Sequence, residues 1–256
     1  MKHAKRLATR AFRQSTREFL AEGPQAVREA LAHERAALEV FATVDATDQH
    51  TDLFQAANRD DVTWHVVTDD VVAALCDTVQ PQGVVARCAM LDRPLEALLD
   101  REPTFLVVCA DIRDPGNAGA VIRCADAAGA HGVVFVGNSV DPFNPKSVRA
   151  TVGSIFHLPI VVSRDIAGSL AAVRRAGLAV LAADGGGDVD LFDSRLDLSA
   201  PTAWLMGNEA WGLPEEVRAL ADRVVAVPIF GRAESLNLAT AAAVCLYTTA
   251  RARLSS

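Results

Sequence analysis

Long apolar runs are missing from this sequence. It has 256 residues, and no apolar stretch reaches the roughly 18 residues that a membrane-spanning helix needs. The first twenty residues carry charges throughout, so they also lack the continuous apolar segment of a secretory signal peptide. We therefore expect a soluble, cytoplasmic protein with no membrane partner.

Metal-binding and disulfide patterns are missing as well. The cysteines are odd in number, none is spaced as C-x-x-C, and three lie inside apolar runs, where cysteine behaves as a small hydrophobic side chain. The histidines are scattered along the chain. The sequence therefore predicts no metal site and free thiols in a reducing compartment. The cysteines are Cys76, Cys88, Cys109, Cys124 and Cys245.

The glycine-rich loops of common nucleotide-binding enzymes are also absent. The chain has no Walker loop, and its helix start near residue 115 lacks the G-x-G-x-x-G of a dinucleotide fold. A nucleoside triphosphate and NAD are therefore poor candidates for a ligand. A Rossmann-type enzyme acting on a small molecule stays a weak alternative.

Charge is present but unevenly distributed. The formal net charge is −7, which argues against a simple nucleic-acid coat protein. Residues 1–20 nevertheless hold six basic side chains against Glu18 alone. A basic end on an acidic protein suits phosphate contacts, although a solvated helix face explains it equally well.

The first ninety residues predict a small α/β domain. Pro24 suits a helix start, and Val27 and Leu31 lie one turn apart on the same helix face. The segment 91–103, with prolines near both ends, predicts a linker. The predicted elements are a helix over 22–33, strands at 38–44 and 63–68, a helix over 69–78, and a turn and strand over 80–90.

From residue 104 onward, apolar strands alternate with helices, which is typical of a mainly parallel sheet. The segment 104–110 is apolar without alternation, as expected of a strand buried on both faces. Further strands are predicted at 133–137, 158–162, 178–183, 202–206 and 224–229, and helices near 118–130, 144–152, 166–176, 214–221 and 236–252.

Three loops carry polar residues where these strands end, and open α/β sheets bind ligands at strand ends. The first, DIRDPGN, leads into a helix that places Asn117 at its start and Arg123 among small residues. The second, MGNEAWG, adds an amide and a carboxylate, Asn208 and Glu209, to a turn that needs only its glycines. Helix capping and a favourable helix dipole explain each loop structurally too.

The third loop precedes a long alanine-rich helix. Gly231 is followed by Ser235, Leu236 and Asn237, which open that helix. Ser235 suits the N-cap position, whereas Asn237 is less ordinary in a first helical turn. Taken singly, each of the three loops has a purely structural explanation.

The order and spacing of the loops are far more specific. DPGNAGAVIRCA, LMGNEAWGL and VPIFGRAESLNLATAAAV resemble the three signature motifs of the SpoU/TrmH family of RNA 2′-O-ribose methyltransferases, which belongs to the SPOUT superfamily. FLAEGPQAVREAL and LCDTVQPQGVVA resemble the small RNA-binding domain, similar to ribosomal protein L30e, that precedes the catalytic domain in many members.

The resemblance implies a fold that physical reasoning alone would not suggest, since true knots are nearly absent from proteins. It implies an α/β SPOUT domain with a mainly parallel sheet and a deep trefoil knot, and a homodimer through the knot region. The implied domains are an L30e-like substrate-binding domain at 1–90, a linker at 91–103 and the knotted methyltransferase domain at 104–256.

The resemblance also implies S-adenosyl-L-methionine as cofactor, bound largely through backbone groups of the knot loops. The implied cofactor-binding residues are Met206, Gly207, Asn208, Gly212, Val227, Ile229, Leu236 and Leu238. The implied catalytic residues are Asn117, Arg123, Glu209, Ser235 and Asn237.

The role of Arg123 has two versions. In the family, the matching arginine activates the 2′-hydroxyl, and Arg123 could act as that base only in a pocket that lowers its pKa. Alternatively Arg123 stays charged and grips a phosphate, while Glu209 or the phosphate takes the proton. Trp211, which stands where the family commonly has a small residue, either packs or stacks on a base or the cofactor.

The expected substrate is RNA, with 23S ribosomal RNA favoured over transfer RNA by the front domain. A non-catalytic RNA-binding or ribosome-assembly protein with the same fold is the alternative of another class. An intact set of catalytic residues argues against that alternative. The expected RNA-binding residues are Lys5, Arg6, Arg10, Arg13, Lys146 and Arg149.

Overall fold

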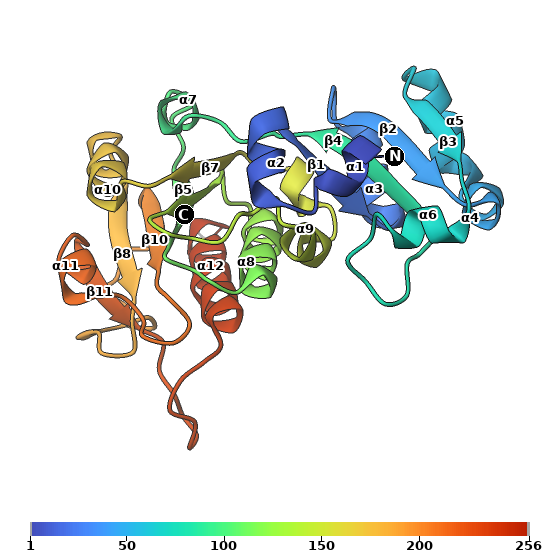
Figure 1. Ribbon diagram of the computed structural model, residues 1–256. Helices are drawn as coiled ribbons and strands as arrows, with labels where there is room; N and C mark the ends of the chain where they lie inside the picture. The colour runs from blue at the N-terminus through green and yellow to red at the C-terminus, as the bar shows by residue number, and fades with distance from the viewer. Residues whose placement is uncertain (1, 255–256) are drawn as a thin grey trace. The chain divides into compact units, whose positions relative to one another are not determined.

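The computed structural model describes residues 2–254, which form two compact units (Figure 1). The first unit comprises residues up to Leu91 together with Asp141–His157. The second comprises Asp92–Val140 and the residues from Leu158 onward. Among the described helices, none is long and apolar enough to span a bilayer.

The first unit is built on a four-stranded sheet in the order β1-β4-β2-β3. Strand β4 is antiparallel to both of its neighbours, whereas β3 is parallel to β2. Its strands are β1 (Glu18–Glu22), β2 (Ala37–Ala42), β3 (Thr63–Val66) and β4 (Val84–Ala89). Its helices are α1 (Lys2–Arg6), α2 (Arg10–Thr16), α3 (Pro24–Ala32), α4 (Val44–Gln49), α5 (Thr51–Arg59), α6 (Asp69–Ala73), α9 (Pro145–Thr151) and the 3₁₀ turn η1 (Ser154–Phe156).

The predicted helix over 22–33 is confirmed as α3. Pro24 occupies its first position, where a missing backbone N–H costs nothing, and Val27 and Leu31 are buried on its inner face. The preceding Gly23 has a φ of 92°, a left-handed conformation that favours glycine. Helices α4 and α5 and strand β1 were not predicted.

Charged side chains link all four strands along one face of this sheet. Arg87 on β4 pairs with Glu18 on β1 at 2.8 Å and with Glu39 on β2 at 2.6 Å. The chain of contacts continues to His65 on β3, whose Nε2 lies 3.0 Å from the Glu39 carboxylate. We call Glu18, Arg87, Glu39 and His65 the ionic ladder.

The segment 141–157 supplies part of the core of the first unit. Phe19 of β1 packs against Phe143 and Phe156, with ring centroids 5.0 and 5.8 Å apart. All three rings are almost fully buried. This segment lies between two strands of the second unit in sequence, yet it belongs with the first unit in space.

The second unit is built on a seven-stranded parallel sheet in the order β7-β6-β5-β10-β8-β11-β9. Its strands are β5 (Phe105–Ala110), β6 (Val133–Val136), β7 (Ile160–Ser163), β8 (Ala179–Ala183), β9 (Val189–Asp190), β10 (Thr202–Met206) and β11 (Arg223–Ala226). Its helices are α7 (Leu95–Leu99), α8 (Pro115–Ala127), α10 (Ile166–Arg175), α11 (Glu215–Arg218) and α12 (Leu238–Leu254).

The mainly parallel sheet expected from the sequence is therefore confirmed. Every residue of β5, β6 and β10 is buried, as continuous apolar runs predict. The segment 91–103 contains α7, whose Leu95 and Leu98 are buried in the core of this unit. The trefoil knot and the domain limits at 90 and 104 stay predictions.

Candidate active site

The three predicted loops follow strands of the same parallel sheet. The first connects β5 to α8, the second follows β10, and the third runs from β11 to α12. Because the carboxyl ends of parallel strands meet at one edge of a sheet, the polar residues of these loops gather there. In Figure 1 the loop before α12 extends from the same end of the sheet as β10 and β11.

Gly207 and Asn208 fix the second loop. A Cβ atom at Gly207 would lie 2.6 Å from the carbonyl carbon of Gly212, closer than real Cβ contacts allow. Asn208 is buried, and its Nδ2 donates to the carbonyl oxygen of Asp111 at 2.7 Å. Its Oδ1 accepts the N–H of Ala210 at 2.8 Å. The amide at position 208 therefore joins the second loop to the first.

Glu209 accepts three hydrogen bonds from the first loop. The backbone N–H groups of Arg113 and Asp114 donate to its carboxylate at 3.2 and 3.1 Å, and Nδ2 of Asn117 donates at 3.3 Å. A carboxylate only accepts hydrogen bonds, so Asn117 must turn its amide nitrogen toward Glu209 and its amide oxygen away. That oxygen accepts from Nδ2 of Asn237 at 3.1 Å. Three predicted catalytic residues thus form one chain of hydrogen bonds.

Asn237 also begins α12. Its Oδ1 accepts the N–H of Ala239 at 2.9 Å, and its carbonyl oxygen accepts the N–H of Ala241. These are the bonds of an N-cap residue, and α12 starts at Leu238. The purely structural explanation of Ser235 as the cap of this helix therefore does not hold. The Asn237 side chain both caps the helix and holds Asn117.

A cavity of about 510 Å³ lies beside this hydrogen-bonded chain. Its charged lining residues are all acidic, namely Asp184, Glu209 and Glu234, and the rest of the lining is apolar or glycine with Asn208 and Ser235. Such a cavity suits a ligand that is apolar in part and positively charged in part. The lining residues are Ala183, Asp184, Gly185, Gly207, Asn208, Glu209, Ala210, Gly212, Ala226, Val227, Pro228, Ile229, Glu234, Ser235, Leu236, Leu238 and Ala241.

The cavity brings together seven of the eight predicted cofactor-binding residues. The exception is Met206, which is buried inside β10 just before the loop and does not line the cavity. Sequence reasoning missed Asp184 and Gly185, which follow β8. The strand-end rule pointed to that loop as well, because β8 lies next to β10 in the sheet.

Arg123 stands apart from the hydrogen-bonded chain. It is exposed on α8, which packs against α12, and it does not line the cavity. Within residues 2–254 it makes no hydrogen bond or ion pair. Its guanidinium therefore keeps all of its donors for a ligand.

Arg13 is not available to RNA, so its predicted role was wrong. The residue is 1% exposed, and its Nε and Nη2 donate to the Asp141 carboxylate at 2.9 and 2.7 Å. Its Nη1 donates to the carbonyl oxygens of Leu7 and Ala8 at 2.7 and 2.9 Å. Arg13 is a structural residue of the first unit.

The other predicted RNA-binding residues are more accessible. Lys5, Arg6 and Arg10 are exposed on α1 and α2, and Lys146 is exposed on α9. Arg149 is half-buried, where its Nη1 lies 3.2 Å from the Glu22 carboxylate and donates to the carbonyl oxygen of Asp77. That pairing occupies part of the Arg149 guanidinium.

The cysteine thiols are free, as predicted. Burial raises the pKa of Cys245 to about 12, and burial together with the nearby Glu22 carboxylate raises the pKa of Cys76 to about 12. Cys88 and Cys109 are fully buried. Within the described part of the chain, histidine, cysteine and carboxylate side chains form no group of three that could hold a metal ion.

Known proteins resemble both halves of the chain. Residues 104–247 match the SpoU rRNA Methylase family, and residues 1–86 match the MRM3-like substrate binding domain. The 23S rRNA (guanosine(2553)-2′-O)-methyltransferase RlmP of Bacillus subtilis (strain 168) is 33% identical over 96% of this chain and 94% of its own length. The 23S rRNA (uridine(2479)-2′-O)-methyltransferase of Streptomyces viridochromogenes is 40% identical over 68% of this chain and 62% of its own length.

Solved structures agree with the sequence matches. The SpoU methyltransferase AviRb of Streptomyces viridochromogenes, in complex with the cofactor AdoMet, matches with a TM-score of 0.87 and 32% identity over 100% of this chain and 98% of that one. An AdoMet-bound rRNA methyltransferase from Sinorhizobium meliloti matches with a TM-score of 0.83 and 34% identity over 98% and 93%. The family expected from the three loops is confirmed, and the chain belongs to the SpoU rRNA methylase family.

Proposed function

We propose that this chain transfers the methyl group of S-adenosylmethionine to the 2′-hydroxyl of a ribose in 23S ribosomal RNA. The observation that carries the proposal is the chain of hydrogen bonds from Glu209 through Asn117 to Asn237, beside a cavity whose only charged lining residues are acids. Family membership and the named activities of RlmP and its relatives support the same reaction.

The residues around the cavity fit the cofactor. Backbone and apolar side chains of Gly207, Val227–Ile229, Leu236 and Leu238 would hold the adenine and the carbon chain. The acidic lining favours a cationic sulfonium and disfavours a polyphosphate. When bound there, S-adenosylmethionine supplies an activated methyl group.

The chain's own residues then orient the reacting groups. Glu209 and Asn208 lock the first two loops together, and Asn237 fixes Asn117 at the entrance to α8. Positioning of this kind supplies on the order of 7–11 kcal/mol, against roughly 3–5 kcal/mol for a general base. Much of the acceleration therefore rests on loop geometry.

Arg123 is best suited to hold the RNA in place. An exposed guanidinium with every donor free grips a phosphate rather than accepts a proton. Of the two versions of its role, this arrangement supports the charged clamp, with Glu209 or the phosphate accepting the proton. Ser235, exposed at the cavity, would contact the ribose or the cofactor.

The RNA is proposed to be 23S ribosomal RNA rather than transfer RNA. The match of residues 1–86 to a substrate binding domain and the exposed basic residues Lys5, Arg6, Arg10 and Lys146 support an RNA contact through the first unit. The non-catalytic alternative is disfavoured because the predicted catalytic residues are present and three of them are bonded together.

A homodimer in the cytoplasm is part of the proposal. Trp211 is 57% exposed, Phe230 88% and Tyr247 53%, all within or next to the second and third loops or on α12. Large apolar side chains in solvent commonly mark contact surfaces. Their place supports a dimer through the knot region, and the exposure of Trp211 argues against packing within its own core. We propose the domain limits 1–90, 91–103 and 104–256 for the same enzyme.

The test is a methyl-transfer assay. The protein is incubated with labelled S-adenosylmethionine and with separated, unmodified ribosomal and transfer RNAs, and the 2′-O-methyl group is mapped by nuclease digestion. We expect label at one ribose of 23S RNA, and none with Arg123→Ala, which should bind the cofactor with unchanged affinity in calorimetry.

Other outcomes contradict specific parts of the proposal. Label in transfer RNA alone would refute the ribosomal substrate. Arg123→Ala with normal turnover and lost cofactor affinity would refute the clamp. Absence of both cofactor binding and label in the wild-type protein would leave the non-catalytic alternative.

A further inference from the structure

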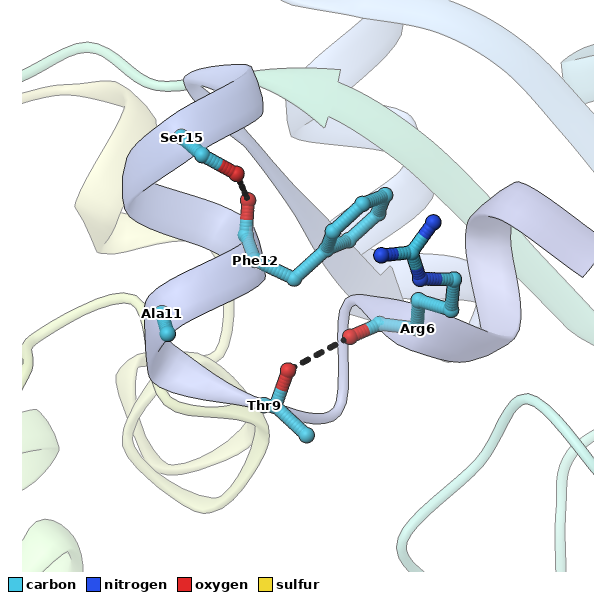
Figure 2. A pocket seen from close by; sticks show the side chains of 5 residues that line it. All are labelled: Arg6, Thr9, Ala11, Phe12 and Ser15. Carbon is cyan, nitrogen blue, oxygen red and sulfur yellow. Dashed lines mark hydrogen bonds between the residues drawn. The ribbon is translucent and has the colours of Figure 1, made fainter.

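The first unit carries a groove that plays no part in the site described above. Its volume is about 350 Å³, and Arg6, Thr9, Ala11, Phe12 and Ser15 line it. These residues come from α1, α2 and the turn that joins them. Figure 2 shows the Arg6 guanidinium beside the Phe12 ring, with Thr9 and Ser15 at the two ends of the groove.

Arg6 and Phe12 form a stacked pair. The guanidinium carbon of Arg6 lies 4.0 Å from the centroid of the Phe12 ring, a cation–π distance. The ring is half-buried and packs on the core of the unit, and His3 meets it edge-on at 5.0 Å. Arg6 is exposed, so this planar cation has a second face open to solvent.

The groove is preformed rather than part of a loose basic tail. Arg13 donates to the carbonyl oxygens of Leu7 and Ala8, which lie in the turn between the two helices. The same side chain pairs with Asp141 in the core, and Leu7 is fully buried. A binding surface fixed in advance loses less entropy when a ligand binds.

The charge around the groove selects an anionic partner. The first 17 residues hold six of the chain's 25 lysines and arginines and none of its 32 acidic residues. Apart from the buried Arg13, these cations are exposed on the surface. Lys5 and Arg10 adjoin the lining residues in sequence. Although the whole chain has a net charge of −7, this cluster of cations attracts phosphate locally.

We propose that this groove binds one unpaired nucleotide of RNA. The base stacks on the open face of the Arg6 guanidinium, and Lys5 and Arg10 contact the adjoining phosphates. The hydroxyls of Thr9 and Ser15 donate to the carbonyl oxygens of Arg6 and Phe12, so their oxygens remain acceptors for base N–H groups. This inference rests on the proposed function for its substrate class and adds a second contact on the RNA, within the first unit.

The experiment measures binding of a fluorescein-labelled oligoadenylate of 12 nucleotides and of a 12-base-pair RNA duplex by anisotropy at several salt concentrations. Arg6→Lys keeps the positive charge and removes the planar guanidinium group. We expect it to weaken single-strand binding about tenfold with an unchanged salt slope, and duplex binding less than about twofold. Arg6→Ala should weaken it further and flatten the salt slope by about 0.7.

Two further variants complete the design. Phe12→Leu keeps the apolar packing and removes the ring beneath Arg6, so it should weaken single-strand binding several-fold, on the scale of a lost stacking contact. Arg59→Ala, which removes an equal charge from the surface of the same unit, is the matched control and should change affinity less than about twofold.

Three outcomes would overturn the proposal. The first is wild-type affinity for single-stranded RNA in Arg6→Lys, and the second is a loss of affinity in Arg59→Ala as large as in Arg6→Ala. The third is binding of polyglutamate that depends on Arg6 and displaces the RNA. The last would identify an acidic protein as the partner. Failure of the proposed function is distinguishable, because methyl transfer to ribosomal RNA can be absent while the Arg6 dependence of oligoadenylate binding remains.

Discussion

The two units of the chain use arginine in opposite ways. In the first unit, Arg13 is 1% exposed and directs its donors to Asp141 and to two carbonyl oxygens. In the second unit, Arg123 is exposed and bonds to no other residue within the described range 2–254. Both look alike in sequence, as basic residues in helical segments. Only the positions of distant acceptors separate a buried, bonded arginine from an exposed one whose donors are unbonded.

The sheets and binding surfaces of the two units also differ, because the first unit relies on charged side chains and the second on apolar residues. The first unit joins its strands with the ionic ladder and forms its groove from side chains. The second unit buries apolar strands on both faces and lines its cavity mostly with apolar residues and glycines. Changes of side-chain charge should therefore have their largest effects in the first unit, and changes that crowd the backbone should have theirs in the second.

Exchanging the two arginines for alanine gives the largest expected contrast. Arg13→Ala leaves Asp141 buried without its partner, so it should lower the free energy of unfolding by about 3–5 kcal/mol. Arg123→Ala should change it by less than about 0.5 kcal/mol and still abolish methyl transfer. Denaturant titrations of both variants make the comparison.

The double variant Arg13→Met/Asp141→Leu is the control, because it removes both charges from the buried site. It should recover much of the stability that Arg13→Ala loses. Equal stability losses for Arg13→Ala and Arg123→Ala would contradict the division of roles.

Adding one methyl group to the second loop should have the next largest effect. Gly207→Ala places a Cβ 2.6 Å from backbone at Gly212, so the loop must move and the cavity with it. Overpacking of this kind costs about 1–3 kcal/mol, which corresponds to roughly a 5- to 150-fold loss of S-adenosylmethionine affinity. Calorimetric titration measures it. Gly231→Ala in the third loop, where a Cβ meets nothing within 4 Å, is the matched control and should bind normally.

The smallest expected effect is that of acid, which should lower the stability of the first unit at a higher pH than that of the second. Burial raises the pKa of Glu39, but hydrogen bonds from Arg87 and His65 outweigh it and hold that pKa below 4.5. Because the folded-state pKa is depressed, the stabilisation is complete above about pH 4.5 and disappears as the pH falls through the lower folded value. Glu39→Gln should remove about 1 kcal/mol of pH-dependent stability in that range.

Hydrogen exchange of the β2 and β4 amides as a function of pH checks this expectation. In the wild-type protein, protection there should fall with acid earlier than protection in β5 and β10. A Glu39→Gln variant that keeps the same acid sensitivity would show that the ladder is not its cause.

Sequence alone predicted the second unit well because its signals are local. Strands buried on both faces, such as β5 and β10, read as continuous apolar runs, and the polar loops follow them directly. Gly207, Asn208 and Glu209 were identified from one short segment. The bond that joins Glu209 to Asn117 spans 92 positions, and it was not predicted, because nothing near either residue in the sequence indicates the other.

The first unit was harder to predict because its decisive contacts are remote in sequence. Arg13 and Asp141 are 128 positions apart, so nothing near Arg13 indicates that it is buried. Helix α4 and strand β1 are short, and tertiary packing rather than propensity determines them. Asp184 was missed for a different reason, because only the sheet order places the end of β8 beside β10.

The position of residues 141–157 determines when the core of the first unit can form during synthesis. Protein domains made on the ribosome generally fold in order from the N-terminus. Here the first unit has all four strands once Ala89 has been made, yet Asp141, Phe143 and Phe156 of its core follow much later. Until then Arg13 lacks its counter-ion and Phe19 lacks its cover. A gene segment that ended at Leu91 would therefore lack part of the core of the first unit.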